Sequence, residues 1–438
     1  MTQGMRTAWR RRAAVALLSV CLFAWSLPVL GAPFQQFIAP EPQPGARFGS
    51  VLAAFDGGLV VGEPSRVNFE PDFAHLGKAY FFDLVSGEFK FTIDNPEPQD
   101  LDSFAGSVTA GGGSLYLSAE GLEERVYAYE ASTGSFVKRI DNPEASLSGF
   151  GGTLAYGQGG LLVAAPSFGR PGPEPLWNVG QSYLFDGLTG SLEQTFPNYE
   201  PNRNDTLGTG NAISLTQDKV VVGSIMDDDT AGRVWIYERH SALPAAIIDN
   251  PDRDDKEDFD WFGWAVDSDE RVVVVGAQER DVDGIVGAGA AYTFDAATGE
   301  LIHRLLSPQP ATNEEFGRSV SLTSRRDIVI GAWGTTLQGV GGAGSVYLFD
   351  GQTGELLRHI RNPQPLDGGV FGWSVDTFGD YLAIGAPGAS AGGVPSAGAV
   401  YLYRIYPVPE PASIYLIVAL IIAFQTGSVV SSRSRTSN

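Results

Sequence analysis

The chain has 438 residues, of which 55 are glycine, 27 are proline and 18% are charged, and its formal net charge is −22 at pH 7. This acidic balance argues against a surface that binds nucleic acid phosphates or anionic lipid. It suits cations, basic partners or calcium-bridged polysaccharide, and solubility alone explains it as well. The abundance of glycine and proline is typical of many short strands joined by turns.

Residues 1–32 have the pattern of an export signal. Arg6 and residues 10–12 are basic, residues 13–22 are apolar, and small residues follow at Gly31 and Ala32. We expect cleavage near Gly31 or Ala32, which would also remove Cys21, the only cysteine. Val20 precedes that cysteine where a lipoprotein signal needs a small residue, so the pattern does not favour lipidation.

The remainder of the chain repeats itself seven times, with a period of about 55 residues. The repeats open on Phe-Gly or a decayed form of it, at Phe48-Gly49, Phe104-Ala105-Gly106, Phe150-Gly151, Leu207-Gly208, Phe262-Gly263, Phe316-Gly317 and Phe371-Gly372. We expect each phenylalanine to fill the space between repeats and each glycine to permit a close backbone approach.

The sixth repeat shows the internal pattern most clearly. Alternating or apolar segments at 316–322, 327–332, 345–350 and 355–360 predict four strands, and Thr353-Gly354 marks a hairpin turn. Aromatic residues at alternate positions of the third strand would lie on one face and pack against the next repeat. Seven such units predict an all-β fold, a seven-bladed β-propeller with four-stranded antiparallel blades.

The last repeat lacks a fourth strand of its own, because proline-rich residues 406–409 follow the third. Residues 34–42, directly after the export signal, match residues 357–365, which form the fourth strand of the sixth repeat and its terminal Pro-x-Pro. We therefore expect the N-terminal strand to complete the last blade, which removes the exposed edges of an open ring.

The repeats resemble FG-GAP repeats, the family that includes the β-propeller of the integrin α-subunit. Besides Phe-Gly, the second strand ends on Gly-Ala-Pro at Gly385-Ala386-Pro387 and on related triplets elsewhere. The resemblance covers about residues 34–406 and implies a binding or structural module. Some members bind calcium through Asp-x-Asp-x-Asp-Gly-x-x-Asp between the first and second strands. The loops expected at those places, 267–270 and 376–380, are too short for that set.

Acidic residues elsewhere are weaker calcium candidates. Asp281 and Asp283 lie between the second and third strands of the fifth repeat, and Asp227 and Asp229 lie similarly in the fourth. Such runs also occur as solvated loop ends, and both interpretations stay open. We predict no cofactor other than calcium.

No catalytic constellation is visible. The four histidines lack metal-ligand spacing, and no nucleophile elbow or phosphate-binding loop occurs. We predict a non-enzymatic, monomeric module whose loops on one rim, between second and third strands, hold the ligand. The alternative is a propeller enzyme acting on polysaccharide or a quinone-linked substrate, which would need convergent carboxylates or a cofactor in the axial channel.

The end of the chain combines three features in order. Pro409-Glu410-Pro411 is followed by an apolar stretch at 414–430 and by Arg433 and Arg435. This order resembles the PEP-CTERM sorting signal of bacteria, which implies recognition by an exosortase, commonly alongside exopolysaccharide export. The apolar stretch alone is also consistent with a plain transmembrane anchor at the short end of the usual length.

These features predict three regions: a signal peptide at 1–32, the propeller at 33–406, and a sorting signal with one transmembrane helix and a basic tail at 407–438. The protein would be exported and anchored in the inner membrane before processing, and would then reach the cell surface or extracellular matrix. Its expected partners are an exosortase-type enzyme and an exopolysaccharide or surface protein, and not nucleic acid.

Overall fold

The computed structural model describes residues 33–64, 77–98, 103–121, 123–144, 148–169, 177–201, 205–227, 231–253 and 259–406. The predicted export signal and sorting signal therefore lie outside the described residues. Ala32–Tyr403 form one compact unit. No helix within the described ranges is long and apolar enough to cross a membrane.

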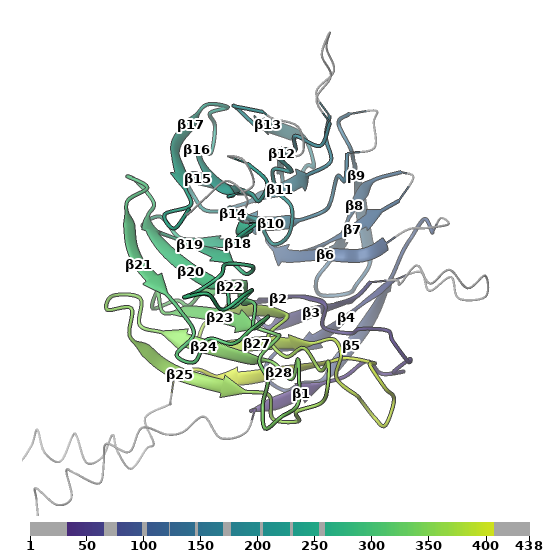
Figure 1. Cartoon of the computed structure of the whole chain (residues 1–438). Helices are drawn as coiled ribbons and strands as arrows, with labels where there is room; N and C mark the ends of the chain where they lie inside the picture. Colours follow the sequence, from purple (N-terminus) through teal and green to yellow (C-terminus); the bar gives the residue numbers. More distant parts are fainter. Residues whose placement is uncertain are drawn as a thin grey trace, which may run out of the picture. The chain divides into compact units, whose positions relative to one another are not determined.

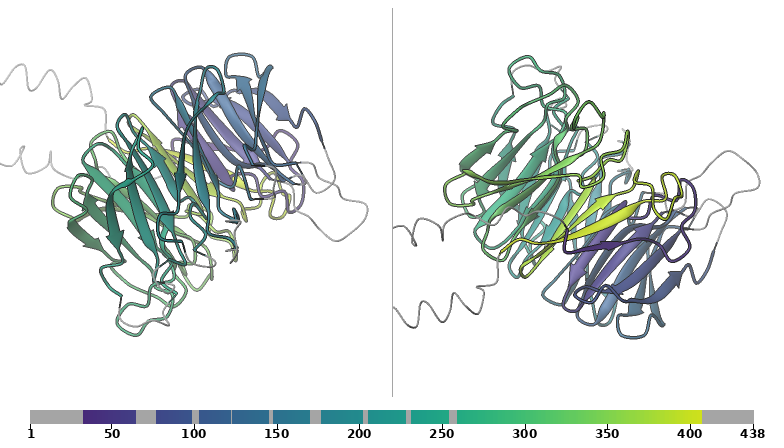
Figure 2. Two further views of the ribbon diagram at one scale, coloured as in Figure 1. Left: turned by 90° about the horizontal axis from the view of Figure 1, so that it is seen from above. Right: turned by 90° about the horizontal axis from the view of Figure 1, so that it is seen from below.

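The compact unit is built from seven antiparallel sheets of four strands each (Figure 1). Blade 1 contains β2 (Val51–Phe55), β3 (Gly58–Glu63), β4 (Lys78–Asp83) and β5 (Phe89–Asp94); blade 2 contains β6 (Ser103–Gly111), β7 (Ser114–Glu120), β8 (Arg125–Glu130) and β9 (Phe136–Asp141); blade 3 contains β10 (Leu154–Gly157), β11 (Gly160–Ala165), β12 (Gln181–Asp186) and β13 (Leu192–Pro197). Blade 4 contains β14 (Ile213–Leu215), β15 (Lys219–Ser224), β16 (Arg233–Glu238) and β17 (Pro244–Asp249); blade 5 contains β18 (Phe262–Ser268), β19 (Val272–Ala277), β20 (Ala290–Asp295) and β21 (Leu301–Leu305); blade 6 contains β22 (Phe316–Leu322), β23 (Ile328–Ala332), β24 (Ser345–Phe349) and β25 (Leu356–Arg361). Figure 2 shows the blades edge-on.

Blade 7 joins the two ends of the propeller. It contains β26 (Ser374–Phe378), β27 (Tyr381–Ala386), β28 (Ala399–Arg404) and, as its outer strand, β1 (Gln35–Phe37). Gln36 is paired with Tyr401, and Phe37 is buried with its ring 5.2 Å from that of Phe82 in blade 1. The predicted closure by the N-terminal strand is confirmed, and the strand also packs on the next blade.

The core lies in layers between neighbouring blades. One layer brings Val274 and Ala291 of blade 5 together with Phe316 and Ile330 of blade 6. Phe316 is fully buried, and its ring lies 5.3 Å from that of Tyr347. The repeat phenylalanine therefore packs as the sequence predicts, and it joins its own blade to the one before it.

A glycine precedes the third strand in every blade except blade 2, where Glu124 precedes β8, and Gly289 shows its role. Gly289 has a φ of 81° and forms a parallel bridge with Phe316 of the next blade. A Cβ at Gly289 would lie 2.1 Å from the Phe316 carbonyl oxygen, which no side chain tolerates. Backbone contact between consecutive blades thus explains why the third strand begins after a glycine.

Candidate ligand-binding site

The predicted calcium residues do not come together. The Asp281 carboxylate accepts the backbone N–H of Gly287 at 2.8 Å, and Asp283 is exposed in the turn that follows. Asp227 is fully buried and accepts the indole N–H of Trp235 at 3.1 Å, while Asp229 lies outside the described residues. Within the described ranges, no group of three or more metal-binding side chains occurs. Calcium at these positions stays a prediction.

A pocket of about 460 Å³ lies beside Asp281 in blade 5. Because β18 and β19 are antiparallel, the residues before β18 and after β19 meet on one rim of the ring. The segment before β18 supplies Phe259, Asp260 and Trp261, and the loop after β19 supplies Glu279 and Asp281. Two aromatic rings and three carboxylates thus line a hollow of the size that binds small molecules.

The carboxylates of this pocket differ in their surroundings. Asp260 is buried, accepts the side-chain amide of Asn250 at 2.6 Å and pairs with Arg280 at 3.2 Å. Glu279 has no hydrogen bond or ion pair to its carboxylate among the described residues. Burial and the nearby charge of Asp281 raise the pKa of Glu279. The pocket therefore keeps acidic groups that repel one another, beside one pair that is already neutralised.

A ladder of stacked groups begins at the pocket wall. Trp261 stacks on Trp264 at 5.0 Å between ring centroids. The guanidinium of Arg318 lies 4.7 Å from the Trp264 ring and 4.1 Å from the Trp373 ring, and Arg47 lies 5.1 Å from Trp373. The ladder crosses blades 5, 6 and 7 and reaches blade 1. It holds the pocket aromatic in a fixed orientation, as recognition requires.

Burial disfavours the charged forms of Arg318 in the ladder and of Glu315 beside it. Arg318 is 9% exposed, and burial lowers its pKa to about 10. Glu315 receives the indole N–H of Trp333 at 2.6 Å, while burial and the charge of Glu279 raise its pKa to about 7. Arg318 attracts both Glu315 and Glu279, so the ladder carries the positive charge that partly offsets the acidic pocket.

The axial channel is a second cavity, of about 320 Å³, lined by the inner strands of all seven blades. Two carboxylates lie in it. Asp376 accepts the backbone N–H of Ala54 in blade 1 at 2.7 Å, and Asp267 accepts that of Leu322 in blade 6 at 2.8 Å. Both residues line the channel and are partly exposed, and burial raises the pKa of Asp376 to about 7 and that of Asp267 to about 6.

Each channel carboxylate thus links its blade to the next one, and the hydroxyl groups behave alike. Ser319 donates to the Gly372 carbonyl at 2.9 Å, and Ser374 donates to the Gly49 carbonyl at 2.9 Å. The channel therefore presents polar groups that are already used between blades. These hydrogen bonds join neighbouring blades around the channel.

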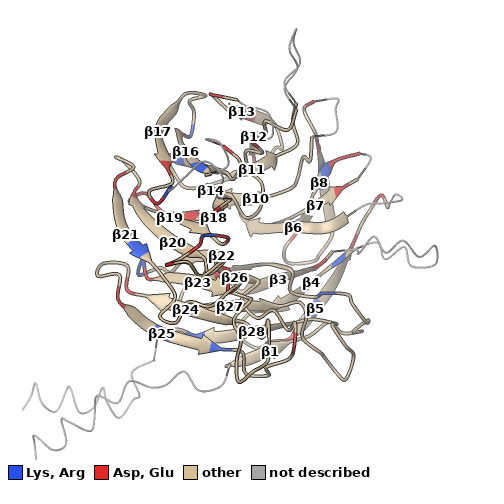
Figure 3. Cartoon of the chain, in the orientation of Figure 1, with Lys and Arg blue, Asp and Glu red and all other residues tan. Residues whose placement is uncertain are grey.

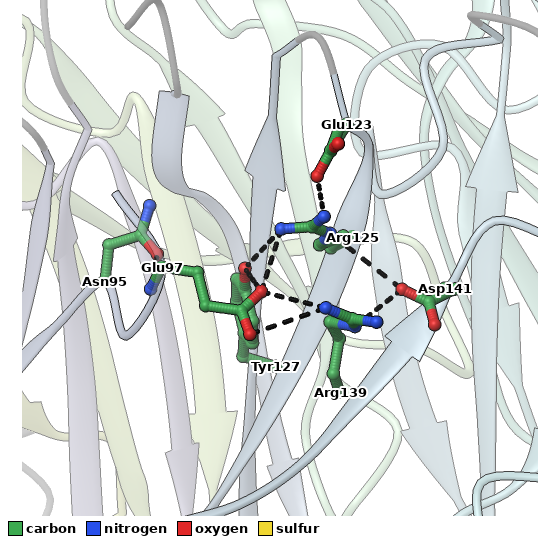
Figure 4. A network of polar contacts seen from close by, with 7 residues as sticks. All are labelled: Asn95, Glu97, Glu123, Arg125, Tyr127, Arg139 and Asp141. Atoms are coloured by element: carbon green, nitrogen blue, oxygen red, sulfur yellow. Dashed lines mark hydrogen bonds and ion pairs between the residues drawn. The ribbon is translucent and has the colours of Figure 1, made fainter. Parts of the chain in front are cut away.

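A charged network lies on β8 and β9, the outer strands of blade 2 (Figure 4). Arg125 and Arg139 contact Glu97 at 2.8 and 3.0 Å, and Arg139 contacts Asp141 at 2.7 Å. Tyr127 donates to Glu97 at 3.3 Å. Figure 3 marks basic residues on β8 and β21; Arg125 on β8 pairs with Glu97, and Arg304 on β21 pairs with Asp252. Exposed pairs of this kind add little stability.

The pocket lies on a loop of the kind that the sequence singles out for ligand binding, and binding there stays a prediction. The loop between second and third strands does contribute, through Glu279 and Asp281. The pocket residue Trp261 and the ladder residue Arg318 were not among the predicted site residues. Trp264, Arg318 and Trp373 do share a position two residues after the repeat phenylalanine, so alignment of the repeats would have shown a common place for them.

The expected loops between first and second strands need correction. Asp267 lies in β18 and Asp376 lies in β26, so both belong to the inner strands and not to the loops. The strands continue farther than their polar residues indicate, because those residues face the channel and bond to neighbouring blades. The sequence pattern alone treats such residues as turn formers.

Comparison with known proteins gives a match to one repeat model and a likeness in fold. The model described as FG-GAP repeat matches residues 253–294, 301–349 and 365–403. No curated protein matches the sequence significantly. A chain of the structure titled "Crystal Structure of Mitotic Checkpoint Complex" aligns with a TM-score of 0.55 and 12% sequence identity over 86% of this chain and 92% of that chain. At this identity the likeness shows the fold alone.

The matched residues fall in the second half of the ring, where the repeat motif is most complete. Blade 4, which opens on Leu207 in place of phenylalanine, is not matched. The FG-GAP propeller is consistent with a binding or structural module and with an extracellular or surface protein. Blades 5, 6 and 7 of this seven-bladed β-propeller match the FG-GAP repeat model.

Proposed function

We propose that the chain is an exported binding protein of the bacterial cell surface or matrix, and that the pocket beside Trp261 holds its ligand. The observation that carries the proposal is the pocket itself, where Phe259 and Trp261 meet three carboxylates on one rim. The Trp261 ring is fixed by stacking on Trp264. A preformed hollow with a fixed aromatic wall and a few polar groups is the usual form of a small-ligand site.

The binding test compares two tryptophans. We expect a ligand from a panel of glycans and peptides, with and without calcium, to raise the melting temperature of the purified protein. Trp261→Ala should abolish this rise. Trp177→Ala is the matched control, because Trp177 is 60% exposed in blade 3 and does not line the pocket. A rise that survives Trp261→Ala would place the ligand elsewhere.

Export and sorting form the second part of the proposal. The basic and apolar segments before residue 33 and the Pro409-Glu410-Pro411 motif support it. Replacing these three residues by alanine should leave an unprocessed, membrane-bound form in the producing cell, visible as a larger band in the membrane fraction. Unchanged processing of that variant would reject an exosortase as the partner.

An enzyme remains the second candidate, because Asp267 and Asp376 do lie in the axial channel. Their hydrogen bonds to Leu322 and Ala54 favour a role between blades. Incubation of the protein with polysaccharides and with quinone acceptors separates the two candidates. Product formation that is lost in Asp376→Asn would establish the enzyme, whereas binding without product supports the module.

A further inference from the structure

We infer that the pocket beside Trp261 selects a protonated amino sugar of a polysaccharide over its neutral, acetylated counterpart. This inference rests on the proposed function, since it names the ligand class of the same pocket. Three features carry it: the carboxylate of Glu279, which makes no hydrogen bond or ion pair among the described residues, the two aromatic rings, and the charge of the surrounding protein.

The first feature is a carboxylate that Arg318 attracts but that has no hydrogen bond or ion pair among the described residues. It belongs to Glu279, which lines the pocket. Asp281 lies close enough to repel it. A cation between the two would relieve this repulsion and form charge-assisted hydrogen bonds, which are stronger than neutral ones. A neutral or anionic guest would leave the repulsion in place.

The second feature is the aromatic wall. Phe259 is 53% exposed and Trp261 is partly exposed, so both rings offer surface to a guest in the pocket. An ammonium group gains attraction from the face of an aromatic ring, most strongly from tryptophan. The C–H groups of a pyranose ring bury their apolar surface against the same rings. An amino sugar unites both parts in one rigid unit.

The third feature is the volume of the pocket together with the negative net charge of the protein. The hollow of about 460 Å³ lies within the range that holds a small ligand. The net charge of −22 attracts cationic chains and repels acidic glycans. Asp260 is already paired with Arg280, so Glu279 and Asp281 are the groups left to meet the ammonium.

The test uses two oligosaccharides that differ only in acetylation. Isothermal titration of the full chain at pH 6 and low salt compares the glucosamine tetramer with the N-acetylglucosamine tetramer. We expect the free amine to bind at least about tenfold more tightly. Glu279→Gln should remove most of this preference, and Trp261→Ala should weaken both sugars.

Glu355→Gln is the matched control, because Glu355 is exposed on blade 6 and the substitution changes the net charge equally. It should leave the preference intact, and melting curves should show that all variants fold. Equal binding of the two tetramers through Trp261 would overturn the inference and leave the proposed function standing. Tighter binding of a lysine peptide, or a preference that survives Glu279→Gln, would also overturn it.

Discussion

Blades 5–7 and blades 1–3 share one backbone plan but carry different chemistry at the same positions. Two residues after the repeat phenylalanine, the first group has Trp264, Arg318 and Trp373, and the second has Ser50, Gly106 and Gly152. Five residues after it, the first group has Asp267, Ser321 and Asp376, and the second has Ala53, Thr109 and Ala155. The blades that match the family model thus hold the pocket, both channel carboxylates and all of the ladder except Arg47.

The difference shows that the repeated residues set the packing between blades, whereas the residues that face the axis and the rim differ from blade to blade. Phe-Gly and the aromatic residues of the third strand occupy the space between blades, so they are constrained by packing in both halves of the ring. The positions that face the axis and the rim are not. Polar and aromatic groups occupy these positions mainly in blades 5–7. The candidate site is therefore asymmetric, although the fold is symmetric.

The largest expected effect concerns the repeat phenylalanine, which blade 6 has and blade 4 replaces with leucine. Phe316→Ala should lower the free energy of unfolding by about 3–5 kcal/mol, because a fully buried ring is lost. Leu207→Ala in the decayed blade 4 should cost at least about 1 kcal/mol less, since Phe316 also contacts the rings of Tyr347 and Phe349. Urea unfolding measures both. Equal losses would mean that the ring contacts add nothing beyond burial.

The next effect concerns the ladder. Arg318→Met keeps most of the side-chain volume and removes the charge between two tryptophans, so we expect a loss of about 2 kcal/mol in unfolding free energy. Thr209→Ala, at the corresponding position of blade 4, should change stability by less than about 0.5 kcal/mol. An Arg318→Met protein as stable as the parent would show that the cost of burying the charge cancels the stacking.

The frame could be predicted from the sequence, whereas most of the site could not. The period, the Phe-Gly pairs and residues 34–42 are local signals, and each led to a correct strand or contact. The pocket depends on how Trp261 and Glu279, on separate segments, meet at one rim after β18 and β19 have paired. The ladder depends on an irregularity in that pairing between Phe262 and Ala265, which presents Trp264 outside the regular register.

The sequence also did not show which acidic residues are buried. Asp227 looks like part of a metal loop in the sequence, and the structure places it against Trp235 inside blade 4. A run of acidic residues looks the same in the sequence whether one carboxylate accepts a hydrogen bond from a buried indole or binds calcium. Only the packing distinguishes them.

The smallest effect tests whether Asp376, one of the two channel carboxylates, lowers the stability of the folded protein. Between the ordinary pKa of an unfolded aspartate, about 4, and the value of about 7 for Asp376, the folded protein holds one proton more than the unfolded chain. The free energy of unfolding must therefore fall as pH rises through this window. Asp376→Asn removes the ionisation and should stabilise the protein by about 1–2 kcal/mol at pH 8, with little change near pH 4.

Asp367→Asn, an exposed substitution before blade 7, is the control and should leave the pH dependence unchanged. Chemical unfolding at several pH values between 4 and 8 measures the difference. If Asp376→Asn is less stable than the parent at pH 8, the bond to Ala54 outweighs the burial of the charge. If it is more stable, the ring keeps Asp376 at a cost to its own stability, and a role beyond packing must account for the carboxylate.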